Sequence, residues 1–170
     1  IETKKANPEN ILLLTFTNKA AQEMKERISE LVDGYPHAAG TFHSFCVRLL
    51  RTDGVQIGID RNFIIYDESD KKDTIKEILD DFEISTDSYN PSALGYQISQ
   101  AKSQMLTPTK YAELVNSDFQ EVVFKVYQRY SNVLREIGAL DFDDLLLDGV
   151  RLLNDSPQTR EKWQTKLTHI

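Results

Sequence analysis

Two short segments of the sequence each end an apolar run with Thr-Phe and then begin an amphipathic helix. The first reads Thr-Phe-Thr-Asn at residues 15–18, and the second reads Thr-Phe-His-Ser at residues 41–44. The apolar run at 11–16 is too short for a helix and is typical of a strand buried on both faces of a parallel sheet. The interval of 26 residues between the two segments suits a β-α-β crossover in such a sheet. The start of the chain is therefore expected to fold as α/β.

A series of helices follows the second segment. The strongest periodic pattern runs from Phe119 to Ile137, with Ser117 placed to cap its start and Gly138 just past its end. Two helices are expected before it, over 19–32 and over about 42–51, and a short extended segment over 63–66. A further helix is expected after a cap at Ser69 or Asp70, with Ile75, Ile78, Leu79 and Phe82 on its apolar face. The remaining expected helices lie over 93–104 and after Pro108, Asp141 and Pro157.

This order of elements predicts a predominantly helical α/β fold. Residues 1–52 form an α/β part, residues 53–139 an all-helical part, and residues 140–170 helices that lead back toward a strand. A helical subdomain inserted into a parallel-sheet domain explains that order most simply.

The net charge of −7 comes mostly from one stretch of the chain. Residues 67–87 carry nine Asp and Glu against three Lys, a net charge of −6, so the rest of the chain sums to only −1. The acidity therefore does not argue against nucleic acid at 15–18 or 41–44, although nucleic-acid binding usually involves a basic patch. A content of 40% hydrophobic and 28% charged residues excludes a disordered chain, and no apolar run approaches the ~20 residues that span a bilayer, so no membrane partner is expected.

The two junctions carry the chemistry most typical of a ligand site. At the carboxyl end of a parallel strand, a helix start offers free backbone N–H groups, hydroxyl and amide donors and an aromatic ring. The backbone N–H groups and the hydroxyl and amide donors suit phosphate oxygens, and an unstacked base can lie on the aromatic ring. A single strand of DNA is therefore the expected ligand. As helix caps and core rings the same residues would have a purely structural role, and spacing alone leaves the two interpretations even. The candidate residues are Thr15, Phe16, Thr17, Asn18, Thr41, Phe42, His43 and Ser44.

Other chemistry is weaker in the sequence. The three carboxylates of 141–144 could bind Mg²⁺, but a capped helix start with acids in its first turn is the favoured interpretation. The single Cys46 has no partner for a disulfide and no second Cys or His at ligand spacing for zinc, so no metal site is predicted. The sequence contains no Gly-x-x-x-x-Gly-Lys-Ser/Thr, so its own residues offer no ATP-binding loop, and no catalytic residue is predicted.

At these residues the chain resembles superfamily 1 DNA helicases of the UvrD/Rep/PcrA type. Residues 11–27, Ile-Leu-Leu-Leu-Thr-Phe-Thr-Asn-Lys-Ala-Ala-Gln-Glu-Met-Lys-Glu-Arg, are similar to the family's motif Ia, and residues 40–45, Gly-Thr-Phe-His-Ser-Phe, to its motif Ib. Residues 57–63, the pair Ala101-Lys102 and residues 140–145 resemble the family as well, in the same order and spacing. The resemblance covers essentially the whole chain.

The resemblance implies an ATP-driven 3′ to 5′ DNA translocase with two RecA-like domains and helical insertions. Residues 1–52 and 140–170 would be parts of domain 1A, and residues 53–139 would be domain 1B, which approaches duplex DNA. The eight junction residues would contact the tracking single strand. ATP and Mg²⁺ would be cofactors of a longer cytoplasmic protein, because the family's ATP loop lies upstream of motif Ia and its Asp-Glu-x-x motif would follow residue 170. The chain is thus expected to be an internal fragment, inactive alone.

Two alternatives remain open. In the first, the chain is a helical protein-interaction module whose acidic face at 67–87 docks a basic partner, and the junction residues are only caps. In the second, the longer protein is a helicase–nuclease. Neither the protein partners nor the pathway follows from the sequence.

Overall fold

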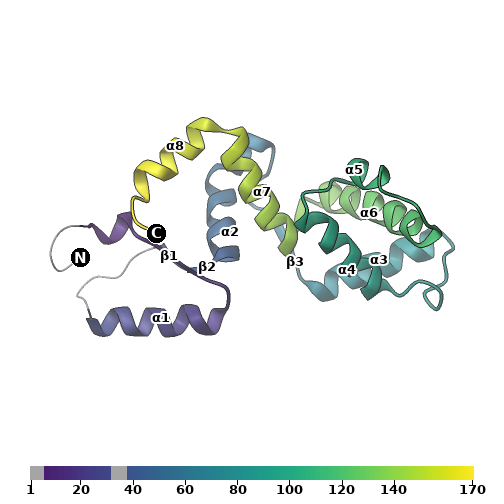
Figure 1. The fold of residues 1–170 in the computed structure, drawn as a ribbon, viewed down its shortest axis with the longest axis horizontal. Coiled ribbons are helices and arrows are strands. Elements are labelled where there is room, and N and C mark those ends of the chain that lie inside the picture. Colours follow the sequence, from purple (N-terminus) through teal and green to yellow (C-terminus); the bar gives the residue numbers. More distant parts are fainter. Residues whose placement is uncertain (1–5, 32–37) are drawn as a thin grey trace. The chain divides into compact units, whose positions relative to one another are not determined.

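A computed structural model describes residues 6–31 and 38–170 and divides the chain into two compact units (Figure 1). The sheet unit is Ile1–Arg61 with Asp148–Ile170, and the helical unit is Asn62–Leu147. These boundaries fall later along the chain than the predicted ones at 52/53 and 139/140, and the assignment to domains 1A and 1B stays a prediction.

The sheet unit is built on a parallel pair of strands. Strands β1 (Leu12–Thr15) and β2 (Ala38–Thr41) pair in the register Leu12↔Ala38 to Thr15↔Thr41. His169 forms a parallel bridge with Ile11, so the end of the chain returns to β1. The helical elements of this unit are η1 (Pro8–Asn10), α1 (Asn18–Leu31), α2 (Phe42–Asp53), η2 (Gly54–Ile57), the second half of α7 (Phe142–Asp155) and α8 (Pro157–Lys166).

Close packing joins α7 and α8 to α2. A Cβ added to Gly149 of α7 would lie 2.9 Å from Sγ of Cys46 on α2, so only glycine allows this approach. Burial also raises the pKa of the Cys46 thiol to about 11, which makes it a poor nucleophile. At the end of α2, the Asp53 carboxylate accepts hydrogen bonds from Nε1 of Trp163 and Nζ of Lys162, both at 2.7 Å.

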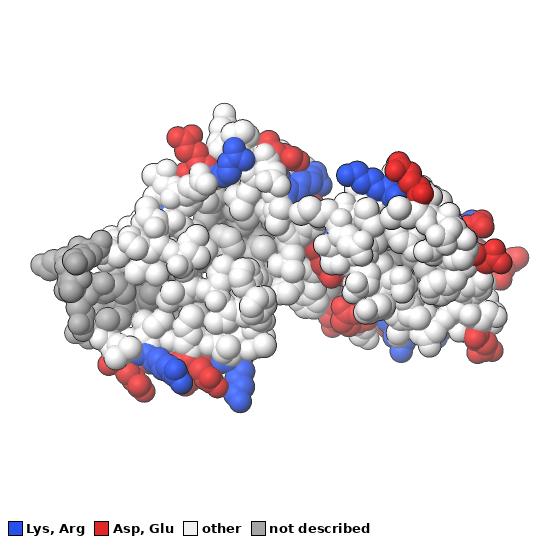
Figure 2. Space-filling view, viewed as in Figure 1, with Lys and Arg blue, Asp and Glu red and all other residues white. Residues whose placement is uncertain are grey.

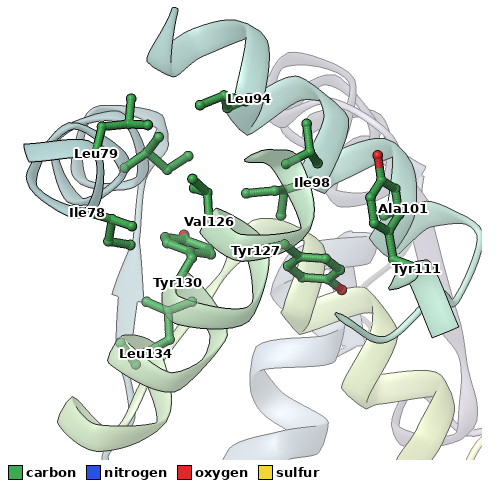
Figure 3. Close-up of a cluster of buried hydrophobic side chains, with 13 residues drawn as sticks. Ile78, Leu79, Leu94, Ile98, Ala101, Tyr111, Val126, Tyr127, Tyr130 and Leu134 are labelled. Atoms are coloured by element: carbon green, nitrogen blue, oxygen red, sulfur yellow. The ribbon is translucent and has the colours of Figure 1, made fainter. Parts of the chain in front are cut away.

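The helical unit surrounds one apolar core. Its elements are β3 (Ile64–Tyr66), α3 (Glu68–Asp81), α4 (Pro91–Ser103), α5 (Pro108–Ala112), α6 (Asp118–Ile137), β4 (Ala139–Asp141) and the first half of α7. Figure 3 shows Leu94 and Ile98 of α4 beside Val126 of α6, with the rings of Tyr127 and Tyr130 beneath them. These five side chains are at most 2% exposed. Complete burial of one such side chain contributes roughly 1.5–3 kcal/mol, so this core holds α4 and α6 together.

The α/β, predominantly helical fold class is confirmed, with two small parallel sheets. The helix predicted over 119–137 is α6, where Ser117 accepts the N–H of Gln120 and Gly138 adopts the left-handed conformation at φ 65°. None of the helices in the described residues is both long and apolar enough to cross a bilayer.

Several local predictions were wrong. The N-cap of α3 is Asp67, which forms a reciprocal capping box with Asp70, and not Ser69 or Asp70. Phe82 lies beyond the last turn of α3 and is 40% exposed instead of buried. Val32, predicted to end the first helix, lies outside the described residues. Strand β4 was not predicted, because its three residues form a strand only by pairing with β3, from Ile64↔Ala139 to Tyr66↔Asp141.

Candidate nucleic-acid interface

The register of the sheet brings the two junctions side by side. Thr15 and Thr41, the last residues of β1 and β2, are direct neighbours across the parallel pair. The next residue of each strand is Phe, and the ring centroids of Phe16 and Phe42 lie 5.1 Å apart with an angle of 35° between the rings. Phe16 is 86% exposed and Phe42 39%, so the pair presents aromatic surface to solvent. An aromatic pair this exposed contributes little to a core and is available for stacking.

At the first junction, Thr17 caps α1. Its Oγ1 accepts the N–H of Ala20 at 3.1 Å, and its carbonyl accepts the hydroxyl of Thr15 at 3.1 Å. Because the Thr17 hydroxyl is the acceptor in its bond, its own hydrogen can still donate to a ligand. Asn18, the first residue of α1, is exposed beside it. This junction therefore keeps polar donors that face solvent.

At the second junction, Thr41 and Ser44 form hydrogen bonds with each other. Oγ1 of Thr41 accepts the N–H of Ser44 at 3.2 Å, and the Ser44 hydroxyl donates back to the Thr41 carbonyl at 2.8 Å. Thr41 is only 8% exposed, and the Ser44 hydroxyl hydrogen is already used. Gly40 leaves room for this hydroxyl, since a Cβ on it would lie 2.5 Å from Oγ of Ser44. Thr41 and Ser44 therefore hold the shape of the junction, in which Phe42 and Ser44 are exposed and His43 is half-buried.

The sheet unit is close to neutral, whereas the helical unit is strongly acidic. The sheet unit has twelve Lys and Arg against eleven Asp and Glu, and the helical unit has eight against sixteen. Figure 2 shows Lys and Arg interspersed with Asp and Glu along α1, the helix that follows the first junction. Lys19 is exposed in the first turn of α1, next to the junction, and was not among the predicted residues. The electrostatic surroundings of the junctions are thus compatible with a phosphate backbone.

The three carboxylates that could have formed a magnesium site are instead engaged by two buried lysines of the helical unit. Nζ of Lys102 lies 2.8 Å from Asp141 and 2.7 Å from Asp144, and Nζ of Lys71 lies 2.8 Å from Asp143. The carboxylates of Asp141 and Asp144 also each accept the other residue's backbone N–H, as the capping box of α7. The favoured interpretation as a capped helix start is confirmed, and the ion pairs were missed because both lysines resemble ordinary surface residues in the sequence.

Burial and neighbouring charges shift the pKa values of this cluster in opposite directions. Burial alone would raise the pKa of Asp141, but Lys102 and Lys71 outweigh it and lower the pKa to about 2. For Asp144 burial prevails, with the charge of Asp141 added, and its pKa rises to about 7 despite Lys102. Burial opposes the charge of Lys102, yet the two carboxylates it binds raise its pKa. One carboxyl group of the cluster therefore titrates near neutral pH.

Within residues 6–31 and 38–170, the structure contains no group of three His, Cys, Asp or Glu side chains arranged to hold a metal ion. The sequence also contains no Gly-x-x-x-x-Gly-Lys-Ser/Thr loop. What the site offers is binding chemistry: exposed rings, hydroxyl and amide donors, and two helix N-termini at the end of a sheet.

The whole chain, residues 1–170, matches the family model described as the UvrD/REP helicase N-terminal domain. It is 40% identical to the "ATP-dependent DNA helicase PcrA" of Staphylococcus epidermidis (strain RP62A) over 172 residues, which cover 100% of this chain and 24% of that protein. It is 38% identical to the PcrA helicase of Staphylococcus aureus (strain Mu50) over the same lengths and shares. The chain thus spans about a quarter of the length of these curated relatives.

Proposed function

The chain belongs to the UvrD/REP helicase family, and we propose that it is part of an ATP-dependent DNA helicase in which its two junctions bind single-stranded DNA. The observation that carries this proposal is the register Thr15↔Thr41, which aligns two helix N-termini and an exposed aromatic pair at one end of one sheet. Relatives described as ATP-dependent DNA helicases support it.

The residues of the junctions have different roles in this proposal. Phe16 and Phe42 stack on bases, and Thr17, Asn18 and the first N–H groups of α1 donate hydrogen bonds to a phosphate. His43 extends the contact from the second junction. Thr15, Thr41 and Ser44 act as positioning residues, because the hydroxyls of Thr15 and Ser44 already donate to backbone carbonyls and Thr41 is only 8% exposed.

The wider assignment follows the family. The sheet unit corresponds to part of domain 1A, and the helical unit to domain 1B, which faces duplex DNA. ATP and Mg²⁺ are held by other parts of a longer cytoplasmic protein, so the chain by itself binds DNA without hydrolysing ATP. This division agrees with the missing phosphate loop and with the share of the relatives that the chain spans.

Fluorescence anisotropy with a labelled oligothymidine tests the site. Loss of one base–aromatic stack costs about 1–3 kcal/mol, so Phe16→Ala is expected to weaken binding roughly 5-fold to 150-fold. Phe82→Ala removes an equally apolar, 40% exposed ring from the helical unit and is the matched control, with unchanged affinity. Equal affinities of the wild-type chain and Phe16→Ala would refute the site.

A second candidate function rests on the acidic surface of α3. Asp80 and Asp81 are exposed there, and the helical unit carries twice as many acids as bases. Such a surface could dock a basic protein. Charge reversal at both positions would then abolish capture of the partner and leave DNA binding unchanged, whereas loss of DNA binding alone would speak against this function.

A further inference from the structure

The first turn of α7 is held by an unusually dense set of buried charges. Two lysines and three carboxylates form what we call the clamp cluster: Lys71, Lys102, Asp141, Asp143 and Asp144. The carboxylates belong to the end of β4 and the first turn of α7, while the lysines come from α3 and α4. Two of the segments that resemble the helicase family, Ala101-Lys102 and residues 140–145, therefore meet in this cluster. Lys102 binds Asp141, which lies 39 residues later in the sequence.

Nearly every polar group of the clamp cluster has a partner. Asp141 also accepts the hydroxyl of Tyr130 on α6 at 3.1 Å, and Asp143 accepts the hydroxyl of Ser99 on α4 at 2.6 Å. The side chains of Lys71, Lys102 and Asp141 are each 3% exposed. Four elements, α3, α4, α6 and β4, therefore fix one turn of a fifth.

Helix capping does not require this arrangement. Asp141 alone would cap α7, as Asp67 caps α3 with an exposed carboxylate and no lysine. Burying charges is costly, and a buried ion pair is often no more stabilising than apolar residues of the same volume. The best-attested benefit of such groups is that they specify one geometry over others.

The place of α7 in the chain gives that geometry a role. The helix begins in the helical unit, and from Asp148 onward its residues belong to the sheet unit. The chain passes between the units only here and between Arg61 and Asn62. A cluster that fixes the direction of α7 therefore acts on a helix that both units share.

We propose that the clamp cluster, with Lys102 at its centre, is a positioning device that fixes the direction of the first turn of α7 on the helical unit. Lys102 is a positioning residue, since it bonds both members of the α7 capping box at once. This inference is independent of the DNA-binding proposal, because it concerns residues of the helical unit alone.

Hydrogen exchange of backbone amides in the 170-residue chain tests the proposal, by comparing residues 145–147 of α7 with residues 123–134 of α6. Lys102→Met leaves two buried carboxylates short of a partner and is expected to lower protection in both segments. At pH 8, above the pKa of Asp144, Lys102→Met with Asp144→Asn restores the original charge balance and keeps an oxygen to cap Asp141. In this double variant, protection of α6 should return to within about threefold of wild type, while that of 145–147 stays at least about tenfold lower.

Lys76→Met is the matched control, because it replaces an exposed lysine of α3 that lies outside the clamp cluster and both segments, and it should leave both segments unchanged. A purely stabilising role would make α6 and residues 145–147 fall and recover together, and that result would overturn the proposal. So would a double variant that fails to fold, because restored charge balance predicts recovery.

Discussion

Replacing Asp144 with Asn should remove most of the pH dependence of stability in the helical unit. The pKa of this carboxyl group is about 7 in the fold, against an ordinary value of 3.8, because burial and Asp141 oppose its charge more than Lys102 favours it. The raised pKa means that the folded state retains a proton that the unfolded chain has lost. The contribution is fully present below pH 3.8 and is lost as the pH rises to about 7.

The shift sets the size of the effect. A difference of about three pKa units corresponds to about 4 kcal/mol, so the free energy of unfolding should fall by up to this amount between pH 4 and pH 8. Asp141 acts in the opposite direction and lower range, because its pKa of about 2 removes stability as the pH falls below 3.8. Besides Asp141, Asp144 interacts with the titratable groups of Lys102 on α4 and of Tyr127 and Tyr130 on α6.

Urea unfolding at several pH values measures this dependence. Circular dichroism follows the helices, and the fluorescence of Trp163, the single Trp of the sequence, follows the sheet unit separately. Asp144→Asn should be more stable than wild type at pH 8 and nearly independent of pH from 4.5 to 8. Asp155→Asn, an exposed carboxylate on the same helix, should keep the wild-type slope. An Asp144→Asn variant that is less stable at pH 8, or that retains the slope, would refute the reasoning.

Three further substitutions test the packing and the junctions. Gly149→Ala should destabilise the sheet unit by about 1–3 kcal/mol, because the added Cβ would meet Sγ of Cys46. Trp163 fluorescence in urea measures this loss, and adding Cys46→Ala should restore most of it. Gly138→Ala should cost the helical unit about 1 kcal/mol in urea unfolding, because its φ of 65° is strained for other residues. Ser44→Ala should weaken oligothymidine binding by no more than about threefold in anisotropy, as expected for the loss of one internal hydrogen bond; a loss as large as that of Phe16→Ala would make Ser44 a direct contact.

The sequence was sufficient to predict the features that are encoded locally. The strand that ends at Thr15 is an apolar run followed by the cap Thr17, and Thr41 ends its strand and itself caps α2. The 20-residue helix α6 has both a cap and a continuous apolar face. Such features depend on neighbours within one or two helical turns, so no knowledge of the fold is needed to recognise them.

Features that depend on distant partners were not predictable. Strand β4 exists only through its pairing with β3, more than 70 residues earlier. Lys71 is 2% exposed and Lys102 4%, yet each stands in a polar sequence context that is typical of the surface. At the junctions, the sequence nominated eight residues but could not separate Thr41, which is buried, or Ser44, whose hydroxyl already donates to Thr41, from the exposed Phe16, Thr17 and Asn18.

In the proposed function, bases stack on the exposed aromatic pair of Phe16 and Phe42 at the end of the sheet. The most direct test compares the affinities of oligothymidine and of an abasic strand of equal length for the wild-type chain and for Phe16→Ala. We expect the wild-type chain to prefer the strand with bases by at least about fivefold, as one stack requires, and this preference to largely disappear in Phe16→Ala. An equal preference in both chains would contradict it.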